Sequence, residues 1–306
     1  MSRIECERCG GRLRLSIPDA AYVCVRDPSN HFWPRGEAEQ RWIAMWRGRA
    51  EADPSDVEAA LGLASVHGTI GSMSLAAGEA ERALALFKDE LAILEALHKA
   101  HGGDGRVQEA LLESLGVQAE IAEQSGQWST CLTVLEQMLP LAQALHDARP
   151  RDDERARALS SCLNGIGRMH RQAGDLGNAA AYFARDLELI SSLCARHSDD
   201  AELATELAIA HFNGYLVSRE AKDELEHLQA AERILDELAG NGTLAERGAD
   251  VRDRVKAVLG VMPAVAARSP EPQRAAHASV EQADSEQGRR AWLIGRVEKE
   301  LQRRRA

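Results

Sequence analysis

The chain has 306 residues, of which 44% are apolar and only 4% are aromatic, and its formal net charge is −11. The negative charge argues against bulk attraction to nucleic acid or anionic lipid. No run of about 18 apolar residues is present that would predict a membrane-spanning helix, and six cysteines are too few for a disulfide scaffold. We therefore expect a cytoplasmic protein with no transmembrane segment.

Residues 1–34 are predicted to form a small segment of their own. Cys6 and Cys9 resemble one knuckle of a zinc ribbon, and Cys24 stands where a third ligand belongs. Asp27 occupies the place of the fourth cysteine, and His31 is an alternative fourth ligand. Zinc accepts carboxylate or imidazole beside thiolate, so the resemblance implies a structural zinc site. The other interpretation is a degenerate ribbon that binds no metal and packs against the first helix.

The segment 35–262 is predicted to be helical. A helix over 36–50 comes first, and the paired helices follow over 57–76 with 79–100, 106–125 with 128–147, 153–173 with 176–196, and 200–220 with 224–240. Proline, glycine and helix-capping aspartates mark the breaks between them. Thr243 and Glu246 have the spacing of a capping box and predict one further helix.

These helices share one register with a period of 48 residues. A glycine recurs at Gly78, Gly126 and Gly174, whereas Lys222 and Asp223 occupy the fourth slot. Apolar anchors follow at constant offsets, for example Phe87, Leu135, Phe183 and Ala231. A period of this size predicts a stack of helix pairs, for which binding is the default function.

The third pair resembles the tetratricopeptide repeat (TPR). It has the signature residues Leu163, Ile166, Gly167, His170, Ala179 and Phe183. The resemblance implies a right-handed α-solenoid of about four TPR-like helix pairs with half-repeat caps at both ends. The period is longer than the usual TPR unit and is similar to that of bacterial and kinesin-light-chain-like repeats. The fourth pair departs most, because Gly214 and Tyr215 replace Ile166 and Gly167, and His227 replaces Ala179.

The TPR resemblance also implies a concave groove lined by the first helix of each pair. Its predicted partner-binding residues are Glu120, Glu123, Asn164, Arg168, Arg171, Phe212, Leu216 and Arg219. The arginines suit a carboxylate or phosphate, Asn164 suits a peptide backbone, and Phe212 with Leu216 suits an apolar anchor. The alternative is a solvated helix face held by intramolecular ion pairs.

Residues 263–285 are predicted to form a flexible linker, and residues 286–306 a basic C-terminal helix. No glycine-rich phosphate loop, nucleophile elbow or His-Glu-x2-His motif is found. We therefore expect a non-enzymatic scaffold, adaptor or regulator that binds a partner protein or peptide. The alternative is a nucleic-acid-associated regulator that uses the ribbon-like segment and the basic helix. A small-molecule or peptide sensor is a third interpretation, and structural zinc is the one cofactor expected.

Overall fold

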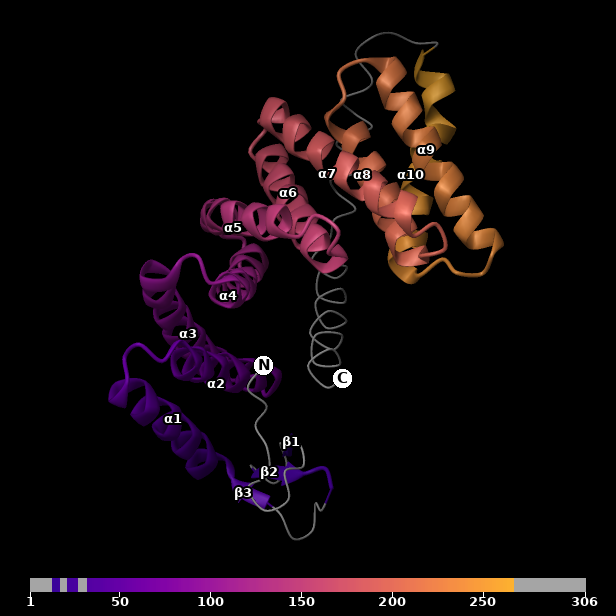
Figure 1. Ribbon diagram of the computed structural model, residues 1–306. Helices are drawn as coiled ribbons and strands as arrows, with labels where there is room; N and C mark the ends of the chain where they lie inside the picture. Colours follow the sequence, from indigo (N-terminus) through magenta and orange to yellow (C-terminus); the bar gives the residue numbers. More distant parts are fainter. Residues whose placement is uncertain (1–12, 17–20, 27–31, 267–306) are drawn as a thin grey trace. The chain divides into compact units, whose positions relative to one another are not determined.

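The computed structural model describes residues 13–16, 21–26 and 32–266 (Figure 1). Three short strands form an antiparallel sheet with β2 in the middle: β1 (Leu13–Ser16), β2 (Ala21–Cys24) and β3 (Phe32–Pro34). The described helices are α1 (Arg35–Ala52), α2 (Val57–Ala76), α3 (Ala80–His101), α4 (Gly105–Gln124), α5 (Trp128–Ala148), α6 (Asp153–Gln172), α7 (Leu176–Arg196), α8 (Ala201–Val217), α9 (Ala221–Gly240) and α10 (Glu246–Ala266).

The chain forms two compact units. Unit 1 contains the residues up to Ala122 together with Thr133–Ala148, and unit 2 contains Glu123–Leu132 and the residues from Arg149 onward. Within unit 1, α2 packs against α1 and α3. Within unit 2, α7 packs against α6 and α8, and α9 packs against α8 and α10.

The predicted helix boundaries have clear local causes. Asp56, Asp152, Asp175 and Asp200 each accept a hydrogen bond from a backbone N–H in the first turn of the next helix. Gly78, Gly126 and Gly174 have φ values of 80°, 68° and 78°, a left-handed conformation that strains any residue with a Cβ. The 48-residue glycine register is therefore a register of turns between the two helices of a pair.

Gly174→Ala is expected to destabilise unit 2 by about 1 kcal/mol, because alanine is strained at this φ. Gly177→Ala is the matched control. Gly177 lies in the first turn of α7, and the nearest heavy atom to an added Cβ there is Asp175 Oδ1 at 3.8 Å. Helix propensity should make the control neutral or slightly stabilising. Urea unfolding of both variants checks this, and an equal loss in both would contradict the assignment of Gly174 as the strained position.

The N-terminal sheet is attached to the first helices through Tyr22. This side chain is fully buried, and its ring lies 4.8 Å from the ring of Trp42 on α1 in an edge-to-face arrangement. Both aromatic residues belong to a cluster with Val66 and Ile70 of α2. The sheet and the first helix pair of unit 1 therefore share one apolar core.

A buried carboxylate reinforces this attachment. Glu39 of α1 is 2% exposed, and it accepts hydrogen bonds from Tyr22 Oη at 2.7 Å and from Arg35 Nε at 2.9 Å. It also forms an ion pair with Arg82 of α3. Burial, and then the hydrogen bond to Glu39, raise the pKa of Tyr22 well above its usual value. The hydroxyl therefore stays protonated, and one carboxylate links β2, α1 and α3.

In unit 2, a ring-over-glycine contact holds α6 and α7 close together. Phe183 of α7 is 2% exposed, and a Cβ added to Gly167 of α6 would lie 2.6 Å from Phe183 Cε1. The same contact occurs in unit 1, where a Cβ on Gly71 would lie 2.8 Å from Phe87 Cε1. The two helices therefore approach each other closely at the signature glycine in both pairs.

The fourth pair reverses this arrangement of large and small side chains. Tyr215 of α8 stands in the register of Gly167, and Ala231 of α9 stands in the register of Phe183. Both are buried in one core cluster of unit 2. The large ring now comes from the first helix and the small residue from the second, so the space between the helices stays filled.

A second layer of the fourth pair is reversed in the same way. Gly214 replaces the large Ile166, and His227 replaces the small Ala179. A Cβ added to Gly214 would lie 2.7 Å from His227 Cε1, so the histidine ring fills the space above the glycine. The departures of the fourth pair from the repeat signature are therefore compensating changes.

The predicted boundaries of the fourth pair, 200–220 and 224–240, are too late by three residues at the turn. α8 ends at Val217, and Ser218 then adopts an extended conformation with φ −63° and ψ 147°. No glycine is available here for a left-handed turn, so the chain leaves the helix earlier and Lys222 and Asp223 lie in the first turn of α9. The left-handed glycine of this pair is Gly242, after α9 and outside the 48-residue register.

The last described helix, α10, covers α8 and α9. Val255 and Val258 of α10 are buried in the same cluster as Tyr215. This is the packing expected of a terminal helix that caps the stack. α10 ends at Ala266, four residues into the predicted linker. The rest of that linker and the predicted basic helix 286–306 lie outside the described residues.

One described helix, α2, is long and apolar enough to cross a membrane by length and composition alone, with a mean hydropathy of 1.2. The prediction from the sequence did not anticipate this. More than half of that stretch, 56%, is buried inside the structure. A single buried helix of this kind is weak evidence for a membrane span, because core helices commonly meet the same criteria.

Candidate functional site

Three of the predicted partner-binding residues of unit 2 are partly exposed and lie on one side of α6. We call the side of α6 that carries Asn164, Arg168 and Arg171 the first-helix face. The three residues are spaced by four and three positions, so they follow one stripe of the helix. All three are half-buried, whereas the opposite side of α6 supplies core residues such as Ile166.

Arg168 forms an ion pair with Glu123, which lies in the last turn of α4 and belongs to unit 2. The two side chains are 37% and 27% exposed. The sequence predicted Glu123 and Arg168 as partner-binding residues, whereas in the structure they form an ion pair with each other. Glu120, one turn earlier in α4, belongs to unit 1 and is half-buried.

Asn164 points toward α7 and contacts a buried carboxylate there. Its Nδ2 donates a hydrogen bond to Asp186 Oδ2 at 3.1 Å, and Ser160 Oγ donates to Asp186 Oδ1 at 2.5 Å. Asp186 is 2% exposed, and burial raises the pKa of its carboxyl group although both hydrogen bonds oppose the shift. Asn164 is thus engaged inside the helix pair through one of its polar groups. Sequence reasoning missed Asp186 and Ser160.

The repeat register contains a signal that would have revealed this contact. Asn164 and Asp186 are 22 residues apart, as are Gly68 and Glu90 in the first pair. A Cβ on Gly68 would run into the Glu90 carboxylate. This position of the first helix therefore faces the second helix of its own pair. A side chain there is partly enclosed between the two helices and is not fully exposed to solvent.

The apolar and terminal residues predicted for the groove are placed differently. Phe212 and Leu216 are only 5% and 9% exposed and lie in the core cluster that includes Val255 and Val258. Their burial does not fit the predicted role of exposed apolar anchors, because α10 packs over α8. Arg219 is exposed, but it follows the end of α8 and lies in the loop before α9.

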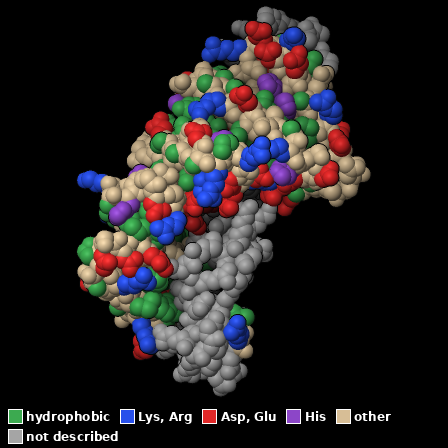
Figure 2. Space-filling view, in the orientation of Figure 1, with side chains coloured by type: hydrophobic (Ala, Val, Ile, Leu, Met, Phe, Trp, Pro, Cys, Tyr) green, Lys and Arg blue, Asp and Glu red, His purple; other side chains and the backbone are tan. Residues whose placement is uncertain are grey.

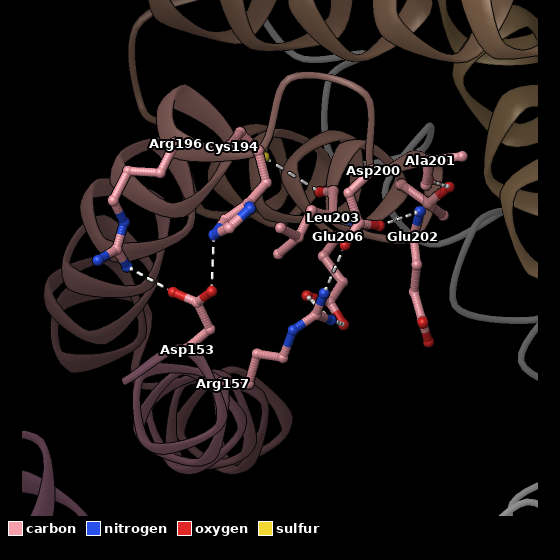
Figure 3. Close-up of polar contacts among 11 residues, drawn as sticks. Asp153, Arg157, Cys194, Arg196, Asp200, Ala201, Glu202, Leu203 and Glu206 are labelled. Carbon is pink, nitrogen blue, oxygen red and sulfur yellow. Dashed lines mark hydrogen bonds and ion pairs between the residues drawn. The ribbon is translucent and has the colours of Figure 1, made fainter. Parts of the chain in front are cut away.

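Figure 3 shows a second set of charges that joins α6 to α8. Arg157 of α6 contacts Asp200 Oδ2 through Nη2 at 3.0 Å and both carboxylate oxygens of Glu206 through Nη1 at 3.2 Å. Burial raises the pKa of Glu206, and Arg157 partly offsets this. Asp200 also caps α8, so Arg157 fixes the start of that helix relative to α6.

The far end of α7 is tied back to α6 by Asp153. Arg196 Nη2 lies 3.0 Å from Asp153 Oδ1, and His197 Nε2 lies 2.6 Å from Asp153 Oδ2 (Figure 3). On the surface seen in Figure 2, basic and acidic side chains are interspersed. The charges of Arg157 and Asp153 therefore link helices within unit 2. Arg168 and Arg171 are the cations of the first-helix face.

The predicted zinc ligands are largely beyond the part of the chain that the structure describes. Cys24 is the last residue of β2, opposite Leu13 of β1. Cys6, Cys9, Asp27 and His31 lie outside the described residues. Among those that are described, no group of three or more His, Cys, Asp or Glu residues is arranged to hold a metal. The zinc site stays a prediction.

Comparison with known proteins finds similarity in fold only. No family model and no curated protein matches the chain. Among solved structures, the S. pombe nuclear import adaptor Nro1 is similar at 12% identity with a TM-score of 0.53, over 72% of this chain and 74% of Nro1.

Two further solved structures match at lower TM-scores. BtubC (BKLC) from P. vanneervenii has 15% identity and a TM-score of 0.38, over 78% of this chain and 93% of BtubC. A thermophilic TPR protein of Thermus thermophilus has 17% identity and a TM-score of 0.31, over 73% of this chain and 91% of that protein. Neither score is high enough to carry an argument. The match to Nro1, together with the helix pairs described above, shows that the chain has a TPR-like helical fold.

Proposed function

We propose that this protein is a non-enzymatic scaffold or adaptor, and that the first-helix face of unit 2 binds a partner protein or peptide. The observation that carries the proposal is the Arg168–Glu123 pair beside Arg171. Arg168 and Arg171 stand on α6, whose packing against α7 is made by other residues, such as Gly167. The side chains of Arg168, Glu123 and Arg171 are each partly exposed, so an incoming partner can reach them.

Because Arg168 and Glu123 are both partly exposed, a carboxylate of a partner can take the place of Glu123. Ion pairs between partly exposed side chains contribute at most about 1 kcal/mol to stability. A carboxylate of a partner can therefore replace Glu123 at little cost, and it gains a guanidinium that forms paired hydrogen bonds. We infer a partner that presents at least one acidic side chain or a C-terminal carboxylate to Arg168 and Arg171.

Charge reversal of the two arginines tests the proposal. Arg168→Glu with Arg171→Glu is expected to weaken partner capture at least about tenfold, because the variant repels an acidic partner. The matched control is Arg185→Glu with Lys222→Glu, which makes the same change in net charge at exposed positions of α7 and α9. Tagged full-length proteins are incubated with lysate of the native cell, and captured proteins are quantified by mass spectrometry. Equal capture by both variants would contradict the assignment of the face.

A charge swap separates binding from stability. Glu123→Arg with Arg168→Glu restores the ion pair with its polarity reversed. If Arg168 serves only the fold, this swap should behave as the unmodified protein in capture. If Arg168 meets a partner carboxylate, the swap should keep normal thermal stability while capture is still reduced.

A cytoplasmic location is part of the scaffold proposal and follows from the cysteine content. The alternative of a nucleic-acid-associated regulator depends on residues 1–34 and 286–306, most of which lie outside the described ranges. A steep loss of affinity for nucleic acid between low and moderate salt would favour that alternative.

A further inference from the structure

Two histidines of the fourth helix pair meet between α8 and α9. His211 Nδ1 and His227 Nδ1 are 3.2 Å apart, and the ring centroids are 5.5 Å apart at an interplanar angle of 53°. Both rings are partly buried, and His227 also fills the space above Gly214. At this separation one Nδ1 donates a hydrogen bond and the other accepts it, so at least one ring must be neutral.

This contact is specific to the fourth pair. The equivalent positions of the third pair are Leu163 and Ala179, which are both buried and apolar. A polar contact between two titratable rings thus replaces an apolar contact in the layer next to the Tyr215 and Ala231 core. The α8–α9 interface consequently contains two imidazole rings that can each take up a proton.

The charges around the rings come from α9. Arg233 acts unfavourably on a positive charge at His211, whereas Asp223 and Glu226 act favourably on one at His227. α7 and α10 also pack against α8 or α9, but none of their described residues is among the causes of the pKa shifts of the two rings. Two positive charges 3.2 Å apart would therefore be opposed by their mutual repulsion and by Arg233, with compensation on the His227 side alone.

We propose that the His211–His227 pair makes the contact between α8 and α9 acid-sensitive, so that this helix pair opens before the rest of unit 2 as the pH falls. Protonation of both rings removes the acceptor of the Nδ1–Nδ1 hydrogen bond and places like charges in a partly buried interface. Opening separates the rings and lets water solvate both. The histidine contact thus holds α8 and α9 together in a pH-dependent way. This inference does not depend on the partner proposed above.

The direction of the pH dependence follows from the pKa values. Burial first, and then His227 and Arg233, lower the pKa of His211 from 6.5 to about 4. Burial also lowers the pKa of His227. The open state therefore binds more protons than the closed state, so stability rises with pH. The contribution of the closed pair is complete above about pH 6.5 and is lost as the pH falls toward about 4.

Three carboxyl groups of unit 2 respond in the opposite direction to the histidine pair, whereas Asp175 and Asp236, whose pKa values are lowered by their hydrogen bonds, respond in the same direction. Burial raises the pKa values of Asp186, Glu206 and Glu224. These groups bind protons more readily in the folded state, so acidification stabilises the folded state through them. The effect of the histidine pair must therefore be measured locally, and by comparison between variants.

Hydrogen–deuterium exchange of the full-length protein, followed by mass spectrometry, provides this local measurement. Protection factors of peptides from α8 and α9 are compared at pH 7 and pH 5, corrected for intrinsic exchange, in buffer with EDTA so that no metal bridges the rings. We expect the protection factors of α8 and α9 to fall roughly fivefold to twentyfold between pH 7 and pH 5. The upper value assumes that the whole lowering of the His211 pKa acts on the opening equilibrium, and the lower value allows for solvent screening of the partly exposed rings. Protection of α6 should change much less.

Variants decide whether the pair is responsible. His211→Asn with His227→Asn keeps polar side chains but removes both titratable rings, so the fall in protection should largely disappear. His197→Asn, at the end of α7, removes a histidine elsewhere in unit 2 and should leave the fall intact. If the double variant is not helical at pH 7, His211→Asn alone keeps His227 above Gly214 and has the same expected outcome. An equal fall in unmodified and variant proteins, or no fall in the unmodified protein, would overturn the proposal.

Discussion

Glu39→Ala is expected to destabilise unit 1 by about 3 kcal/mol, which is a large part of the stability of a domain. The substitution removes the acceptor of the fully buried Tyr22 hydroxyl and the partner of Arg35 and Arg82. Arg82 can turn to water because its side chain is 42% exposed, but Tyr22 cannot. Urea unfolding of the full-length protein at pH 7 measures the loss.

Glu95→Ala is the matched control for this prediction. Glu95 lies on the exposed side of α3 in unit 1, and its replacement should change the free energy of unfolding by less than about 0.5 kcal/mol. Fluorescence of Trp42 should also shift to longer wavelength in the Glu39 variant, since the tryptophan packs against Tyr22. A loss below about 1 kcal/mol would show that the carboxylate does not hold the sheet on the helices.

Phe183→Ala is the second change with a large expected effect, a loss of about 3–5 kcal/mol in unit 2. Phe183 is fully enclosed between α6 and α7, and Gly167 leaves no side chain that could move into the cavity. The refilling of the space would require the helices to approach each other further, which close-packed neighbours resist. Thermal and urea unfolding measure the loss.

Tyr182→Ala is the control for the cavity. Tyr182 is the preceding residue on α7, and its half-buried ring stacks on His170 at a centroid distance of 5.6 Å. Removal of a partly exposed ring should cost about 1 kcal/mol, because much of the lost contact is with solvent. Equal losses for the two variants would mean that the ring-over-glycine contact is not what holds α6 and α7 together.

The local structure could be predicted from the sequence at positions where the conformation or the packing allows only one type of residue. The left-handed turns at Gly126 and Gly174 are of this kind, and so is the approach of Phe183 to Gly167. The fourth pair was less predictable, because the exchange of large and small residues between Tyr215 and Ala231 is visible only once both helices are in place.

The candidate site was predicted in part. The stripe on α6 that contains Arg168 and Arg171 is partly exposed, as expected from helix periodicity. The partners of its residues could not be read from one helix: Asn164 meets Asp186 on α7, and Arg168 meets Glu123 on α4. Phe212 is buried rather than exposed as predicted, because α10 packs over α8 and this contact cannot be read from α8 alone.

The most direct test of the scaffold proposal is a titration of one captured, purified partner against three full-length proteins by isothermal titration calorimetry. The proteins are the unmodified chain, Arg168→Glu with Arg171→Glu, and the control Arg185→Glu with Lys222→Glu. The proposal predicts that the first pair of substitutions raises the Kd at least about tenfold, or about 1.4 kcal/mol, while the control stays within about twofold. The same Kd for all three proteins, at equal helicity by circular dichroism, would show that the partner binds elsewhere.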